Sequence, residues 1–139
     1  MTDSLFAAAH RCLVESDPER KADRALALRD DWTGGRLAVD RAVDLPDVVE
    51  AGRPARPALV EARALSKRGA GSPEGRAALV HAVVHIEFNA INLACDAVYR
   101  FRAMPEAFYD DWIRIAAEEA QHFMMLRDRL RELGYDYGD

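Results

Sequence analysis

Apolar side chains recur every three to four residues along much of this chain, and that period predicts α-helices. The first predicted helix covers Asp3 to Glu15. The second opens with Asp17 and Pro18, a capping residue followed by proline at the first helical position, and ends before Gly34. Neither helix carries a set of side chains that indicates chemistry.

Two longer helices are predicted in the second half of the chain. One begins after the capping hydroxyl of Ser72 and covers Pro73 to Phe101. The other covers Pro105 to Leu133 and stops at Gly134. Long helices of nearly equal length that are joined by a short turn form an antiparallel hairpin.

The segment between the two helix pairs, residues 36–72, lacks a helical period because prolines and glycines interrupt it. Short helical turns are expected near Asp47 to Glu50 and near Leu59 to Leu65. The sequence therefore predicts one compact all-α domain in three parts: a helical pair (1–35), an irregular Pro/Gly-rich segment (36–72) and a helical hairpin (73–139).

Composition excludes some classes of protein. A chain of 139 residues can bury a sizeable core without disulfides. The net charge of −5 disfavours nucleic acid or an anionic membrane as a partner. Cys12 and Cys95 are far apart in sequence and are expected to be free thiols. We expect neither a signal peptide nor a segment as long as a membrane span, and therefore a cytoplasmic protein.

Two glutamates interrupt the apolar stripes of the long helices. On a helical wheel Glu87 falls among Val83, Ala90 and Ala94, and Glu119 falls in a stripe made of Phe108, Trp112, Ile115, Phe123, Leu126, Leu130 and Leu133. An ionised carboxylate in apolar surroundings is costly unless it is neutralised, paired or bound to a metal. Neither stripe contains a lysine or arginine placed to neutralise it.

The two glutamates are also predicted to lie at the same height. Glu87 is 16 residues before Ala103 in the turn, and Glu119 is 16 residues after it. His122, three residues after Glu119, shares that region because residues three apart are neighbours on a helix. Each residue alone is better explained by structure. Together, Glu87, Glu119 and His122 predict a metal site.

These stretches resemble an uncharacterised bacterial family with a ferritin-like fold. The resemblance rests on Gly71 to Arg76, His85-Ile86-Glu87 with Ala90, Phe108 to Trp112, Glu118 to Phe123, and Gly134 with Tyr137-Gly138-Asp139. It implies a four-helix bundle with a di-iron or, second, a di-manganese carboxylate centre. Glu87, Glu119 and His122 would be ligands, one glutamate bridging the ions.

The family continues into two further helices that carry the second half of the ligand set. This chain offers half of that set, so the expected partner is either a missing C-terminal half or a second copy in a homodimer. The implied activity is that of an oxygen-activating oxidase or hydroxylase, or of a ferroxidase, acting on O2 or a small molecule.

Two other interpretations stay open. In the first, the chain is a metal-free helical interaction module whose glutamates are protonated or neutralised by a partner. In the second, it is an RNA-modifying hydroxylase, which the absence of any run of Lys or Arg disfavours. His81 and His85 lie one turn apart and point away from Glu87, so a structural or surface role is favoured for them.

Overall fold

The computed structural model describes residues 3–57 and 71–139. Its elements are β1 (Asp3–Ser4), α1 (Leu5–Val14), α2 (Pro18–Thr33), β2 (Leu37–Ala38), α3 (Pro73–Arg100) and α4 (Glu106–Glu132). The protein is predominantly helical, which confirms the all-α class, and the predicted helix bounds differ from the observed ones by at most two residues.

Side-chain caps explain where three of the helices begin. The side chains of Ser4, Asp17 and Ser72 each accept a hydrogen bond from a backbone N–H three residues later. Each of these bonds satisfies one of the amide groups that the first turn of a helix leaves unpaired. Helix α4 ends as predicted, because Gly134 has a φ of 88°, a conformation that glycine adopts readily.

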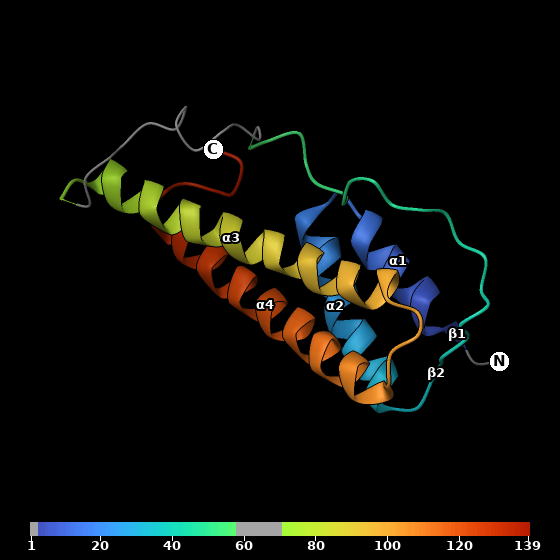
Figure 1. The fold of residues 1–139 in the computed structure, drawn as a ribbon. Coiled ribbons are helices and arrows are strands. Elements are labelled where there is room, and N and C mark those ends of the chain that lie inside the picture. Colours follow the sequence, from blue (N-terminus) through green and yellow to red (C-terminus); the bar gives the residue numbers. More distant parts are fainter. Residues whose placement is uncertain (1–2, 58–70) are drawn as a thin grey trace.

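The four helices pack around one core. Helices α3 and α4 run side by side in opposite directions, and the shorter α1 and α2 lie against the half of this pair nearest the connecting turn (Figure 1). An aromatic contact connects the N-terminal helices to the long helix pair: Phe6 of α1 packs edge to face on Tyr109 of α4, with ring centroids 5.6 Å apart. Helix α1 packs mainly on α3, and α2 mainly on α4.

The sequence pattern did not reveal one small feature. Strands β1 and β2 form a parallel pair in which Asp3 lies opposite Leu37 and Ser4 opposite Ala38. Two residues are too few to show the alternation of apolar and polar positions that predicts a strand. The β1–β2 pairing therefore holds the start of α1 next to the residues that follow α2.

The irregular segment is held along α1 and α3 by hydrogen bonds. Arg102 donates to the carbonyl of Val43 at 2.9 Å, and the Tyr99 hydroxyl donates to the carbonyl of Pro46. The N–H of Gly52 bonds to the carbonyl of Leu13 at 2.8 Å. A Cβ at residue 52 would lie 2.2 Å from the carbonyl oxygen of Val14, so only glycine permits this approach.

The expected helical turn near Asp47 to Glu50 is wrong, since residues 47–50 form no helical turn. The physical reason is that carbonyls just before it bond to side chains from the end of α3 rather than to amides further along their own segment. The second expected turn, near Leu59 to Leu65, lies outside the described residues.

The predicted position of the two glutamates needs a correction. The deepest face of α3 contains Val84, Phe88 and Ile91, which are fully buried, whereas Val83 and Ala90 beside Glu87 are only partly buried. On α4 the fully buried residues extend from Leu130, about 20° around the helix from Glu119, to Ala117 at about 160°. Each glutamate therefore lies at the edge of the buried face of its helix rather than at the centre of that face.

Helix α3 also corrects the expectation that no segment has the length of a membrane span. Residues Pro73–Arg100 contain an 18-residue window with a mean hydropathy of 1.4. Core helices of proteins that never enter a membrane pass the same test. Here one side of α3 packs on α1 and α4, and 33% of this window is buried.

Candidate metal centre

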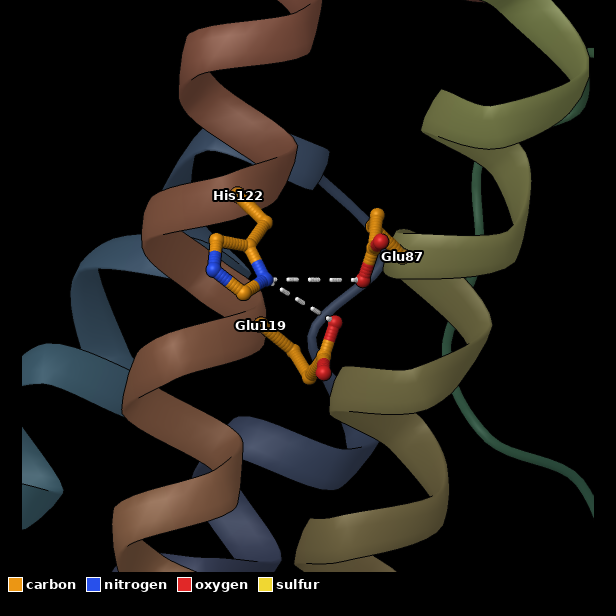
Figure 2. A group of neighbouring side chains, drawn as sticks. All are labelled: Glu87, Glu119 and His122. Atoms are coloured by element: carbon orange, nitrogen blue, oxygen red, sulfur yellow. Dashed lines mark ion pairs between the residues drawn. The ribbon is translucent and has the colours of Figure 1, made fainter.

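The structure brings the three predicted ligands together. Glu87 comes from α3, and Glu119 and His122 come from successive turns of α4; all three point into the space between the two helices (Figure 2). One ligand atom from each lies within 4.8 Å of the other two. The sequence predicted this grouping, because Glu87 and Glu119 are equally far from the turn and His122 follows Glu119 by three residues.

The distances leave room for an ion rather than for direct bonding. His122 Nδ1 lies 3.6 Å from Glu119 Oε2 and 4.0 Å from Glu87 Oε2. Both separations exceed the length of a hydrogen bond. Two ligand atoms that each lie about 2.0–2.2 Å from one metal ion are up to about 4.4 Å apart from each other. Small side-chain rotations would therefore let these three residues bind one ion.

One atom of the group lacks a partner. Glu119 Oε2 is fully buried and accepts no hydrogen bond from the described part of the chain. A buried carboxylate oxygen without a donor is destabilising. Among residues 3–57 and 71–139, the ion pairs of Glu87 and Glu119 are both with His122, whereas Arg127 and Arg114 pair with Asp136 and Asp111. A metal ion would supply the missing positive partner.

The group is enclosed on one side and open on the other. The exposed fractions are 20% for Glu87, 23% for Glu119 and 53% for His122. Beyond the glutamates the apolar surface continues into side chains that reach solvent: Leu79, Ile86 and Leu93 of α3, and Met125 of α4. The three polar groups thus lie at the boundary between the core and an apolar surface that is exposed in this chain.

His81 and His85 take no part in this group. They contact the C-terminal residues instead: His85 Nδ1 lies 2.7 Å from the hydroxyl of Tyr137, whose ring stacks on His81 at a centroid distance of 5.3 Å. The N–H of Gly138 donates to His81 Nε2 at 3.0 Å. The predicted structural role of both histidines agrees with these contacts, although no feature of the sequence identified Tyr137 as their neighbour.

The contact of His81 with Gly138 is expected to depend on pH. Burial lowers the pKa of His81, although the Asp139 and Asp136 carboxyl groups act in the opposite direction. A histidine whose folded-state pKa is depressed contributes stability that is present above its unfolded value of about 6.5 and is lost as the pH falls through the folded value. We therefore expect the hydrogen-exchange protection of the Gly138 amide to fall between pH 7.5 and 5.

His81→Gln is the matched control, because a glutamine carbonyl accepts a hydrogen bond at any pH. Protection factors corrected for intrinsic exchange, measured by amide NMR, should depend on pH in the wild type and not in this variant. A wild-type protection factor that stays constant over the range would contradict the prediction.

The sequence analysis missed a second buried polar cluster. Lys21 of α2 is fully buried, and its ammonium donates to the carbonyl of Leu13 at 2.8 Å and to the side-chain oxygen of Asn92. Close by, the sulfurs of Cys12 and Cys95 lie 3.1 Å apart. Both cysteines lie on apolar faces, but the packing of α1 on α3 that joins them cannot be read from either helix alone.

Comparison with known proteins identifies relatives but no activity. A family described as "Protein of unknown function (DUF455)" matches residues 14–139. An uncharacterized protein of Haemophilus influenzae is 45% identical over 107 aligned positions, in an alignment that covers 69% of this chain and 37% of that relative. The matched region thus spans little more than a third of the relative's length. No solved structure matches this chain.

Proposed function

The chain belongs to the DUF455 family of proteins of unknown function, and on that premise we propose that it is a ferritin-like metal-carboxylate protein. In this proposal Glu87, Glu119 and His122 hold iron, or manganese as the alternative. One observation carries the proposal: ligand atoms from three side chains converge within 4.8 Å, and one of the carboxylate oxygens is buried without a hydrogen-bond donor among the described residues.

The donor set suits these metals. Carboxylate and imidazole ligands bind iron and manganese, whereas thiolate-rich sites select zinc or copper. The two glutamates balance the charge of the ion, and the exposed side of His122 leaves a path for a small molecule or O2. When bound, the metal supplies Lewis acidity and redox chemistry, which would serve oxygen activation by an oxidase or hydroxylase, or Fe(II) oxidation by a ferroxidase.

A complete di-metal site of this class has four carboxylates and two histidines, and this chain contributes half of that number. We propose that a second half completes it, either a second copy related by two-fold symmetry or a missing C-terminal half. The exposed apolar residues beside the glutamates support this proposal, because exposed apolar patches mark interaction sites. A cytoplasmic location is part of the same proposal.

A thermal melt with added metal tests the assignment. A ligand that binds only the folded state stabilises it by about 2.7 kcal/mol at a concentration 100 times Kd. For a chain of this size we therefore expect Mn(II), or anaerobic Fe(II), to raise the melting midpoint by roughly 5–10 °C. Size-exclusion chromatography with metal analysis then gives the stoichiometry, for which one ion per chain in a dimer is expected.

The exposed apolar side chains of Leu79, Ile86 and Leu93, considered without the metal-ligand group, favour a second candidate function. In this alternative the protein is a metal-free helical interaction module, and the two glutamates are neutralised by groups of a partner. It predicts that neither metal changes the midpoint while the chain still associates through this face. The same melt, repeated at several protein concentrations, separates the two functions.

A further inference from the structure

Cys12 and Cys95 are distant in sequence but in contact in the fold. Cys12 lies on the buried face of α1 and Cys95 on the buried face of α3. The S–H of Cys95 donates to the sulfur of Cys12 across 3.1 Å, and the S–H of Cys12 in turn donates to the carbonyl of Lys21 at 3.5 Å. Neither cysteine is exposed, so each is the other's nearest thiol.

The surroundings distinguish the two sulfurs. The hydrogen bond from Cys95 lowers the pKa of Cys12, and the nearby Lys21 ammonium acts in the same direction. The same hydrogen bond, together with burial, raises the pKa of Cys95 well above its usual value. Because the S–H of Cys95 donates to Cys12, Cys12 can lose its proton and keep this hydrogen bond, whereas Cys95 keeps its proton. The thiolate is the nucleophile, so the geometry assigns Cys12 as the attacking sulfur.

A cavity near the pair brings small molecules close to it without reaching either sulfur. The cavity has a volume of about 190 Å³, and its lining includes Leu13 and Asp96, which adjoin Cys12 and Cys95 in sequence. A water molecule occupies about 30 Å³ in the liquid, so the cavity admits a molecule the size of hydrogen peroxide. The Lys21 ammonium can only donate hydrogen bonds, so it orients the Asn92 side chain with its oxygen toward Lys21. The Asn92 Nδ2 is buried and has no hydrogen-bond acceptor among the described residues.

From this arrangement we propose that Cys12 and Cys95 are an oxidisable dithiol, which a small hydroperoxide converts into an intramolecular disulfide between α1 and α3. The Cys12 thiolate attacks a peroxide oxygen; an S–O bond forms, the O–O bond breaks, and the leaving oxygen takes up a proton as water or alcohol. The Cys95 sulfur then attacks the Cys12 sulfur; the S–S bond forms, and the hydroxyl leaves as water with the Cys95 proton. The two thiols lose two electrons, which reduce the peroxide.

The disulfide would connect two helices whose cysteines are 83 positions apart. Joining positions so far apart restricts the unfolded chain strongly, and for loops of this size we expect the melting midpoint to rise on the order of 10 °C. A reductant should reverse the rise. The oxidised state would therefore hold α1 against α3 and stabilise the part of the core that the N-terminal helix completes.

The test uses the whole chain, reduced and then treated with graded hydrogen peroxide in a buffer that contains a chelator. The chelator keeps metal ions from contributing, so the result is independent of the proposed metal centre. After unfolding and alkylation, the expected product is about 2 Da lighter than the reduced chain and carries no alkyl group, and peptide mapping joins Cys12 to Cys95. Oxygen added to single sulfurs, a disulfide between chains, or two thiols that remain alkylatable would overturn the proposal.

Isosteric variants test which sulfur attacks. In Cys95→Ser the serine hydroxyl can still donate to Cys12, and the sulfenic acid formed there has no thiol to react with. We expect a sulfenic-acid probe to label this variant at least about tenfold more than Cys12→Ser at the same peroxide dose. Equal or reversed labelling would contradict the assignment of Cys12 as the nucleophile, and thermal melts of both variants confirm that they are folded.

Discussion

Replacement of Glu119 with alanine is expected to weaken Fe(II) or Mn(II) binding by at least about 100-fold, since even groups that only support metal ligands contribute 10- to 100-fold. The change removes the buried oxygen that lacks a partner and one of the two carboxylates of the group. Without metal, the same variant should be as stable as the wild type or more stable, because an unsatisfied buried acceptor costs about 1–3 kcal/mol. Metal titration and chemical unfolding measure the two effects.

The two expected effects of Glu119→Ala, weaker metal binding and equal or higher stability without metal, distinguish a metal ligand from a structural residue. Loss of metal together with gained apo stability fits a ligand, whereas a residue with a purely structural role would lose stability on removal. His122→Ala should also lose metal, and Glu118→Ala is the matched control, because Glu118 is exposed on the same helix and outside the group. If all three variants retain as much metal as the wild type, the proposed centre is wrong.

Replacement of Phe88 with alanine is expected to destabilise the protein by about 3–5 kcal/mol, the range for removing a buried aromatic ring. Phe88 is fully buried on α3, and its ring lies 5.9 Å from that of Phe123 on α4 and 5.5 Å from that of Tyr137 near the C-terminus. The Lys21 ammonium of α2 lies 5.6 Å from the same ring. One side chain thus connects α2, α3, α4 and the C-terminal residues.

Urea unfolding followed by circular dichroism measures this loss. The midpoint should fall while the dependence on denaturant stays constant, which is the signature of a change in stability alone. Ile86→Ala is the matched control on the same helix: its side chain is 62% exposed in the single chain, so at protein concentrations where the chain is monomeric the loss should be below about 1 kcal/mol. Equal losses in the two variants would show that the core does not centre on Phe88.

The helices could be predicted from the sequence because their signals are local. Ser72 with Pro73 marks the start of α3, and Gly134 marks the end of α4, and each signal acts through backbone groups within a few residues. The grouping of Glu87 with Glu119 could also be predicted, since equal distance from a turn fixes equal height in an antiparallel pair.

What could not be predicted depends on how separate helices pack. Glu87 and Val84 both lie on apolar parts of α3, and only the packing of the neighbouring elements determines that Val84 is buried and that Glu87 lies at an edge. The contact of Cys12 with Cys95 and the stacking of Tyr137 on His81 arise from the same long-range packing. Sequence periodicity indicates that a face is apolar but does not show which neighbour covers it.

The exposed leucine and isoleucine side chains of α3 follow a spacing with a geometric consequence. Leu79, Ile86 and Leu93 are each seven residues apart, one heptad, and a straight α-helix drifts by about 20° over that interval. A helix that packs along all three is therefore expected to cross α3 at about +20° and to wind around it with a left-handed twist. In such a pair the three side chains fill successive holes between the side chains of the other helix, which fixes its register.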